Sequence, residues 1–233
     1  MIIMHNLIFI PARKNSKGLK NKNIKNLNGL PLIEHTFLQV KKLKIKNSLV
    51  FVSTDSKKII KIAEKYSFKT GYIRPSKLSK DKSNIYDAII DGINWLKKNK
   101  KINIKNIILL QPTSPLRNSN EITNAFKYYK KKNLNSLFTI TPVIQSPREI
   151  ISIDKKNNYS FILKNKNYYQ RQQYKTKYFF IDGSIYIIDY ITLRNKKKLI
   201  TRSSTPYLIN KKYSIDIDDN EDFVVVKKIL KND

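Results

Sequence analysis

Two aspartates near the end of the chain, in 214-SIDIDD-219, lie two residues apart. Asp216 and Asp218 alternate with isoleucines, which predicts a strand that carries both carboxylates on one face. Two carboxylates this close repel each other unless a cation lies between them, and Mg²⁺ is a cation that carboxylates and phosphates hold together. Alternatively, the pair ends a strand, and Asp219 or Asn220 caps the helix that follows.

A basic loop near the start of the chain, 10-IPARKNSKGLKNKN-23, directly follows an apolar run. Arg13 can donate a forked pair of hydrogen bonds to phosphate oxygens, and Lys17 adds a mobile charge. Ser16 offers a hydroxyl, and Gly18 permits a close approach of the backbone. The glycine patterns of P-loops and of dinucleotide-binding turns are both absent. The residues alone leave two interpretations open, a phosphate-binding loop and a basic surface turn.

A third polar segment, 110-LQPTSPLR-117, follows another apolar run. Its prolines stiffen the backbone, and Gln111 and Arg117 are candidates to point into a cleft. The alternative is a proline-stiffened turn in which Ser or Thr caps the next helix.

The elements that must position these residues alternate along the first part of the chain. Apolar runs predict strands, and segments with helical spacing predict helices. The predicted strands are 7–10, 49–54, 70–73, 106–110 and 136–143, and the predicted helices are 31–43, 55–66 (capped by Thr54 or Asp55), 84–99 and 119–132. This alternation predicts an α/β fold with a mostly parallel sheet covered on both faces. The basic loop, 53-STD-55 and 111-QPTSPLR-117 would then share the rim at the carboxyl ends of the strands.

The pattern changes after about residue 145. Residues 145–180 are polar and aromatic, and they predict hairpins or an arm that leaves the sheet. The chain then returns with predicted strands 184–189, 206–209 and 213–218 and a final helix, 220–230. We expect one domain, 1–233, with 145–180 as its arm.

The composition limits the function classes. The chain has 233 residues, no cysteine and a formal net charge of +30. Disulfide and thiolate chemistry are therefore excluded, and no stretch approaches the ~18 apolar residues of a membrane span. Of the 47 basic residues 40 are lysines, spread along the chain, whereas nucleic-acid surfaces cluster arginines and aromatics. We expect a cytoplasmic protein with neither a nucleic-acid nor a membrane partner.

Taken together and in order, five motifs resemble the acylneuraminate cytidylyltransferases, or CMP-sialic acid synthetases, and their relatives acting on legionaminic and pseudaminic acids. The motifs are IPAR-x-x-SKGL-x-x-KN, VSTD, RP-x-x-L-x-x-D, LQPTSPLR and SIDID, and the resemblance covers about residues 7–230. It implies a Rossmann-like, mostly parallel sheet of the nucleotide-diphospho-sugar transferase type, with helices on both faces and a protruding dimerisation arm.

The resemblance also implies a reaction. CTP would be joined to a nine-carbon α-keto acid sugar with release of pyrophosphate, in a homodimer that uses Mg²⁺ (or Mn²⁺) bound to Asp216 and Asp218. The residues it implies for the nucleotide are Ala12, Arg13, Ser16, Lys17, Gly18, Asn23, Arg74 and Asp81. Arg13, Lys17, Asp216 and Asp218 form the implied catalytic set.

On the sugar side the resemblance implies Gln111, Arg148, Arg171, Asp182 and Tyr186. The chain departs from the family at 180-FIDG-183, where Phe180 and Asp182 replace the Arg and Asn of an Arg-x-Asn-Gly sequence. Arg148 and Arg171 are candidates to bind the sugar carboxylate instead, so the identity of the sugar stays open.

Other residues in the basic region carry no such expectation. We interpret Lys14 and Lys20 as part of the general lysine excess. His5 and His35 lie outside the matched motifs, so we expect no histidine base.

Three other hypotheses remain. The first is another sugar nucleotidyltransferase of the same fold with a different sugar or nucleotide. The second is a basic nucleic-acid-binding module, which gives no reason for the aspartate pair. The third is a catalytically inactive binding protein, which the altered 180–183 segment keeps open.

Overall fold

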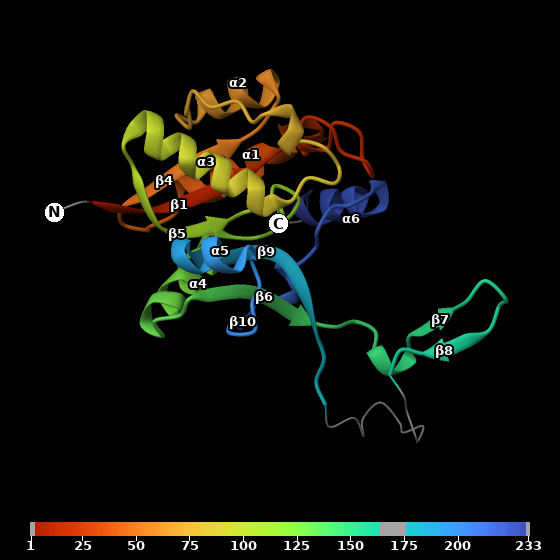
Figure 1. The fold of residues 1–233 in the computed structure, drawn as a ribbon. Helices are drawn as coiled ribbons and strands as arrows, with labels where there is room; N and C mark the ends of the chain where they lie inside the picture. Colours follow the sequence, from red (N-terminus) through yellow and green to blue (C-terminus); the bar gives the residue numbers. More distant parts are fainter. Residues whose placement is uncertain (1–2, 164–175, 232–233) are drawn as a thin grey trace.

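The computed structural model describes residues 3–163 and 176–231. A six-stranded sheet lies at its centre, in the order β10-β6-β9-β5-β1-β4 (Figure 1). The strands are β1 (Met4–Pro11), β4 (Ser48–Ser53), β5 (Asn103–Leu109), β6 (Ser136–Pro142), β9 (Phe179–Asp189) and β10 (Thr205–Leu208). Of these six, β9 alone runs antiparallel to its neighbours. The predicted mostly parallel sheet is confirmed.

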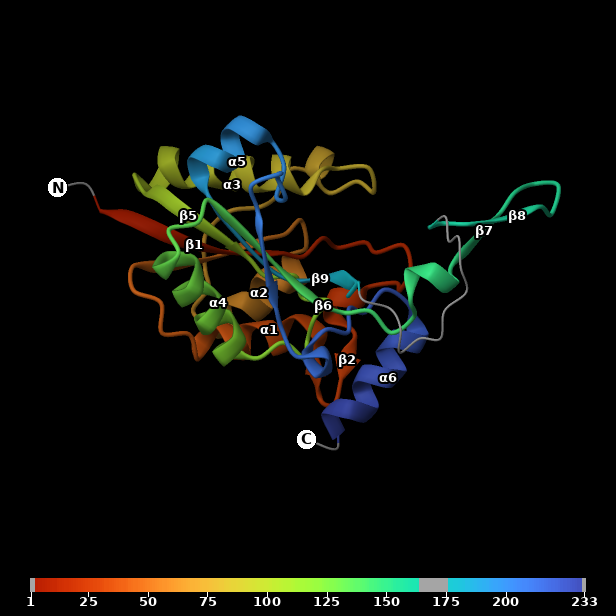
Figure 2. The same cartoon turned by 90° about the horizontal axis from the view of Figure 1, so that it is seen from below.

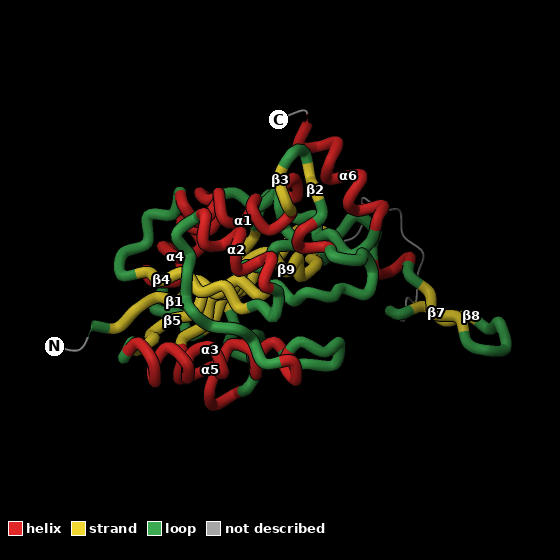
Figure 3. The backbone as a smooth tube through the Cα atoms, turned by 90° about the horizontal axis from the view of Figure 1, so that it is seen from above, coloured by secondary structure: helices red, strands yellow, loops and turns green. Residues whose placement is uncertain are grey.

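Helices cover both faces of the sheet (Figure 3). On one face lie α3 (Ile85–Lys100) and α5 (Tyr190–Lys196); on the other lie α1 (Leu32–Lys41), α2 (Lys57–Lys65) and α4 (Ser119–Lys131). Side chains alternate along β1, so Ile8 and Ile10 pack into one apolar core and Leu7 and Phe9 into the other. Both faces of β1 are buried, as expected for a central parallel strand.

A third apolar cluster attaches the C-terminal helix α6 (Asn220–Lys231) to the N-terminal part of the chain. The helix lies beside the short hairpin of β2 (Asn26–Leu27) and β3 (Leu30–Pro31) (Figure 2). The cluster joins Leu19, Leu27, Leu32, Leu116, Ile217, Phe223 and Val226. Burial of these side chains therefore holds α6 against residues 19–32 at one edge of the molecule.

A two-stranded hairpin of β7 (Ile151–Ile153) and β8 (Tyr159–Phe161) projects from the main body (Figure 1). It pairs with no other strand of the described chain. The expected arm, 145–180, also contains residues 164–175, which lie outside the described residues.

The final helix begins at a reciprocal cap. Asp219 accepts a hydrogen bond from the Asp222 amide at 2.9 Å, and the Asp222 carboxylate accepts from the amides of Asp219, at 3.2 Å, and Asp218, at 2.9 Å. This arrangement satisfies amides of the first turn. Of the two expected capping residues, Asp219 is therefore the one that caps α6.

Two predicted strands do not form. Residues 70–73 have no ladder partner; Gly71 has φ +76°, and the next amide, of Arg74, donates to the Thr54 carbonyl. Residues 211–213 form a 3-10 helix, and 214–218 follow as a loop in which the Ile217 amide donates to the Thr113 carbonyl. In both places the amide bonds to a carbonyl in the loop that follows β4 or β5, and no ladder of hydrogen bonds with a strand forms.

The predicted cap of α2 is also wrong. Ser56 accepts from the Ile59 amide, while Thr54 Oγ1 accepts from the Ser56 amide and Asp55 accepts from the Lys14 amide. The two expected capping side chains are thus bonded to other amides.

Among the described residues, no helix is long and apolar enough to cross a membrane.

Candidate active site

A cavity of about 410 Å³ opens at the carboxyl ends of β1 and β5. Four segments line it: the loop after β1, residues 74–88, the start of the 111–117 loop, and 216–218. Ten of the expected site residues line the cavity: Arg13, Ser16, Lys17, Gly18, Asn23, Arg74, Asp81, Gln111, Asp216 and Asp218. The basic loop and the start of 111–117 therefore share one cavity, whereas 53-STD-55, the third segment of the predicted rim, does not line it.

The basic loop is fixed at both ends. The buried Ala12 donates its amide to the Ser53 carbonyl at 2.9 Å, which continues the pairing of β1 with β4. Asn23, also buried, donates from Nδ2 to the Arg13 carbonyl at 3.0 Å. Ala12 does not line the cavity, so its contribution is to hold the backbone that carries Arg13.

Two cations of the loop share one carboxylate. Arg13 Nη1 lies 2.6 Å from Asp81 Oδ1, and Lys17 Nζ lies 3.4 Å from Asp81 Oδ2. The hydrogen bond from Arg13, with a smaller contribution from Lys17, lowers the pKa of Asp81. With two positive charges against one negative, this side of the cavity keeps an excess that attracts anions.

Arg74 is anchored at the end of β4. Its guanidinium donates to Ser53 Oγ at 2.9 Å and to the Ser53 carbonyl at 2.5 Å, and the residue is only 5% exposed. Burial lowers the pKa of Arg74. The backbone of β4 thus presents a fixed guanidinium at the edge of the cavity.

The acidic segment touches the basic loop directly. A Cβ atom on Gly18 would lie 2.3 Å from the carbonyl oxygen of Asp218, so no other residue type fits there without a shift of the backbone. Lys22 Nζ donates to the Ile217 carbonyl at 2.5 Å and lies 3.3 Å from Asp218 Oδ1. The first loop and the last loop of the fold therefore share one wall of the cavity.

Asp216 and Asp218 differ in exposure. Asp218 is exposed, whereas Asp216 is half-buried and accepts a hydrogen bond from Ser114 Oγ at 3.4 Å. Burial raises the pKa of Asp216, and the negative charge of Asp218 raises it further. A cation between these carboxylates would relieve both effects.

The described residues contain no group of three or more His, Cys, Asp or Glu side chains that could hold a metal ion. Asp216 and Asp218 supply two hard oxygen ligands, which suits Mg²⁺, because this ion usually keeps waters and takes substrate phosphates as further ligands. The donor set fits a nucleotide-bound magnesium ion.

Lys22 is the clearest residue that the sequence did not single out. Its side chain is 11% exposed, and it lines the cavity between the two loops. It belongs to the KN pair of the first motif, but its type carries little signal among 40 lysines. Other lining residues that were not predicted are Pro11, Leu78, Lys80, Ser83, Asn84, Ile85, Ala88, Pro112 and Thr113.

Of the sugar-side residues that the structure describes, only Gln111 lines this cavity. Arg148 lies in a 3-10 helix, Pro147–Glu149, at the base of the projecting hairpin. Tyr186 is half-buried on β9, and burial raises its pKa. Asp182 is buried, and its carboxylate accepts hydrogen bonds from Thr139 and Ser184. Arg171 lies outside the described residues.

Comparison with known proteins agrees with this geometry. A family model described as Cytidylyltransferase matches residues 7–220. The chain is 30% identical over 230 residues to a CMP-N,N'-diacetyllegionaminic acid synthase of Legionella pneumophila, covering 97% of each chain. It is 30% identical over 224 residues to an N-acylneuraminate cytidylyltransferase of Streptococcus agalactiae, covering 96% of this chain and 52% of that protein. It is 27% identical over 228 residues to a pseudaminic acid cytidylyltransferase of Campylobacter jejuni, covering 98% and 97%.

Solved structures share the fold. A CMP:2-keto-3-deoxy-manno-octonic acid synthetase complexed with CTP superposes with a TM-score of 0.70 at 16% identity, over 98% of this chain and 99% of that one. A 4-diphosphocytidyl-2C-methyl-D-erythritol synthase of Anaerococcus prevotii gives 0.62 at 11% identity, over 98% and 99%. The predicted nucleotidyltransferase type of α/β fold is confirmed.

Proposed function

Because this chain belongs to the cytidylyltransferase family, we propose that it transfers CMP from CTP to the anomeric 2-hydroxyl of a nine-carbon α-keto acid sugar and releases pyrophosphate. One observation carries the proposal. A single cavity joins an excess of cations on the loop after β1 to the carboxylates of Asp216 and Asp218. This arrangement suits a triphosphate at one side and a reacting α-phosphate at the other.

The nucleotide is assigned to the side of the basic loop. Arg13 and Lys17 exchange their pairing with Asp81 for the β- and γ-phosphates, and they neutralise the charge that develops on the leaving pyrophosphate. The remaining assigned contacts come from Ser16, Gly18, Asn23 and Arg74. Lys22, between the two loops, is assigned to the α-phosphate.

The reaction is an in-line displacement at phosphorus. The 2-hydroxyl oxygen of the sugar forms a bond to the α-phosphorus as the bond to the α–β bridging oxygen breaks, and the hydroxyl proton is released. Asp216 and Asp218 would hold Mg²⁺ (or Mn²⁺), which supplies charge neutralisation at the phosphates when bound. Placement of the two substrates then contributes most of the remaining rate enhancement.

The acceptor is assigned to the side of Gln111 and Tyr186. Gln111 lines the cavity, and Tyr186 follows two residues after the buried Ser184 on β9. Arg148 or Arg171 is assigned to the sugar carboxylate. The substrate class, sialic, legionaminic or pseudaminic acid, rests on the names of the three relatives that cover nearly the whole chain.

We also propose that the protein acts as a homodimer in the cytoplasm, where CTP is available, with residues 1–233 as one cytidylyltransferase domain. The projecting hairpin supports the homodimer. Ile151, Ile153, Tyr159 and Phe161 lie on one of its faces, opposite the paired hydroxyls of Ser152 and Ser160. An isolated hairpin is marginally stable in water, so an apolar face of this kind gains from a partner surface.

The test is a pyrophosphate-release assay with CTP, Mg²⁺ and, separately, N-acetylneuraminic, N,N'-diacetyllegionaminic and pseudaminic acids. We expect turnover with at least one acid. ATP, GTP and UTP, each with the same acids, are the matched controls. Faster turnover with another nucleotide would favour a different sugar nucleotidyltransferase of this fold, and CTP binding without turnover for any acid would favour an inactive binding protein.

A further inference from the structure

A buried guanidinium lies in the loop between β5 and α4, six residues after Gln111, which lines the cavity. Arg117 is 1% exposed, and among the fully buried side chains of the described residues it has the largest volume. A buried charge is unfavourable unless hydrogen bonds and opposite charges compensate it. The burial of this arginine close to a cavity-lining residue therefore calls for a structural or a functional explanation.

Arg117 bonds to three separate parts of the fold. It donates to Thr36 Oγ1 at 3.1 Å and to Gln39 Oε1 at 3.0 and 3.2 Å, both on α1. It also donates to the carbonyl of Gln111 at 3.2 Å and to that of Ser184, on β9, at 2.7 Å. The planar guanidinium thus fixes the backbone at Gln111 relative to β9.

The surrounding groups are themselves fixed. Gln39 donates from Nε2 to the Pro115 carbonyl at 2.7 Å, which orients its oxygen towards Arg117. All the direct acceptors of Arg117 are neutral oxygens. Ser184 links Arg117 to Asp182, because its carbonyl accepts from the guanidinium and its hydroxyl donates to Asp182 Oδ2. Burial lowers the pKa of Arg117, and the negative charges of Asp182 and Asp216, neither of which bonds to it directly, oppose this shift.

The carboxylate of Asp182 is bonded to other side chains of the protein. It is 2% exposed and accepts hydrogen bonds from Thr139 and from Ser184, whose Oγ lies 2.9 Å from Asp182 Oδ2. Fully satisfied polar networks of this kind make a region rigid. The network ends at the two parts of the chain that carry Gln111 and Tyr186.

We propose that Arg117 is a positioning residue for the acceptor side of the site, with Asp182 as its counter-charge rather than a contact of the sugar. The inference rests on the proposed function for its choice of substrate. Loss of the guanidinium would let the Gln111 backbone and β9 shift independently, while the nucleotide side, which Ser53 and Asp81 hold, would keep its geometry.

The matched pair of variants is Arg117→Lys and Arg74→Lys. A lysine keeps the charge but cannot bridge acceptors on three elements. We expect Arg117→Lys to raise KM for the accepted sugar acid, or lower kcat at saturating acid, by about tenfold to a hundredfold, with KM for CTP nearly unchanged. Arg74→Lys should raise KM for CTP instead.

Tyr129→Phe is the control for a purely structural loss. Its hydroxyl bonds to Asn106 at 3.0 Å, at the opposite end of the sheet, so this variant should lower stability and leave both KM values unchanged. Asp182→Asn keeps the shape of the side chain and removes the counter-charge. It should change the sugar KM in the same direction as Arg117→Lys, and it decides the inference if Arg117→Lys does not fold.

Hydrogen exchange measured by mass spectrometry gives a readout without turnover. We expect Arg117→Lys to speed exchange in peptides covering 110–117 and 182–188 and not in those covering 4–10. Unchanged exchange in both segments, or faster exchange throughout, would overturn the inference. If no acid supports turnover in the wild type, the proposed function fails, while these exchange measurements still decide the role of Arg117.

Discussion

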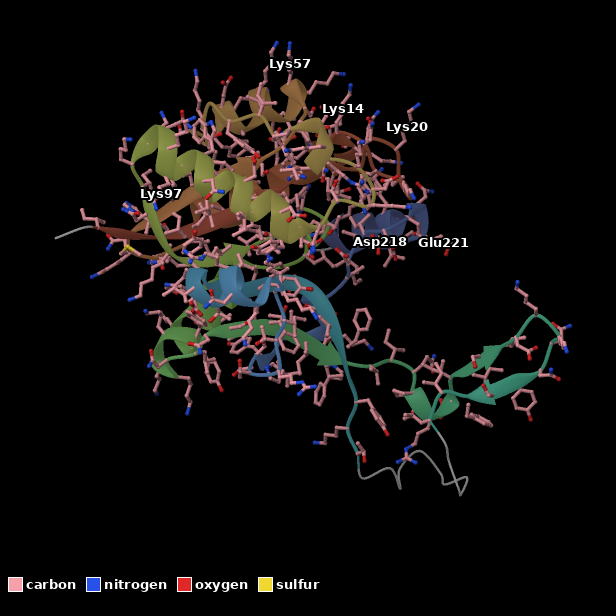
Figure 4. All side chains as sticks on the ribbon, in the orientation of Figure 1. Lys14, Lys20, Lys57, Lys97, Asp218 and Glu221 are labelled. Atoms are coloured by element: carbon pink, nitrogen blue, oxygen red, sulfur yellow. The ribbon has the colours of Figure 1, made fainter. Side chains whose placement is uncertain are left out.

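The lysines and the arginine of the loop after β1 differ in their ion-pair partners. Arg13 and Lys17 share Asp81, and Lys22 pairs with Asp218. Lys14 and Lys20 are exposed and extend outward from the ribbon (Figure 4). Cations that face the cavity are available to phosphates, whereas those in solvent contribute mainly to the general field.

Replacement of the cavity-facing cations tests this distinction. We expect Arg13→Ala or Lys17→Ala to lower pyrophosphate release by about a hundredfold or more, because charge that develops on the leaving group loses its partner. Lys14→Ala and Lys20→Ala are the controls and should stay within about twofold, since neither lysine lines the cavity. Circular dichroism checks the fold, and near-normal turnover of both cavity variants would contradict the assignment of the loop.

The aspartate pair gives a prediction for the metal. Asp216→Ala combined with Asp218→Ala should remove activity together with its dependence on Mg²⁺. The control is Asp219→Ala, which removes a helix cap and should lower the free energy of unfolding by about 1 kcal/mol, with the magnesium titration unchanged. Metal-dependent turnover in the double variant would place the ion elsewhere.

Residue types, their order and the family resemblance predicted half of the residues that line the cavity and missed the others for identifiable reasons. The loop, Gln111 and the aspartate pair were found because each follows a predicted strand or stands out in charge. Lys22 could not be separated from other lysines by type, and its role depends on a contact with Asp218 from the far end of the chain. Asp182 was expected at the sugar and Arg117 in a cleft, but both are buried and neither lines the cavity, which a local pattern does not reveal.

At the scale of elements, the projecting hairpin has two chemically different faces. Ile153 and Tyr159 are 64% and 67% exposed on the apolar face, although both are large side chains that favour burial. The opposite face carries Ser152 and Ser160. A second copy of the chain that covers the apolar face would explain the difference.

Single charges on each face test this contact. We expect Ile153→Asp to convert a dimer into a monomer, because an unpaired carboxylate would be buried in the interface. Ser152→Asp, on the other face, should leave the dimer intact. Light scattering coupled to size-exclusion chromatography measures the mass. A dimer that tolerates Ile153→Asp, or a wild-type monomer, would exclude the hairpin as the contact.

Elements with a clear period were predicted well, and the failures share one cause. The buried strands and amphipathic helices correspond to β1, β4, β5, β6, β9, β10 and α1 to α4, with α6 at the end. The segments 70–73 and 214–218 were predicted as strands but form loops. The Arg74 and Ile217 amides bond to the carbonyls of Thr54 and Thr113, in the loops that follow β4 and β5, and a short local pattern does not distinguish such a loop from a strand.

At the scale of the whole molecule, the net charge of +30 is opposite in sign to the proposed substrates, which are all anions. A field of this size raises the local concentration of anions and is screened by salt. We expect KM for CTP to rise about threefold or more between low and physiological ionic strength. Lys97→Gln with Lys98→Gln, on α3, should weaken this salt dependence slightly without changing kcat, and a KM independent of salt would exclude a role for the field.

The contact between Gly18 and Asp218 joins two segments that lie far apart in the sequence. On a ribosome, the basic loop is synthesised long before the segment that completes the wall of the cavity. Partly made chains therefore carry the cations of the loop without the aspartates that face them. A complete site arises only after residues 216–218 have been made and α6 has docked, so shorter nascent chains hold no complete site for CTP.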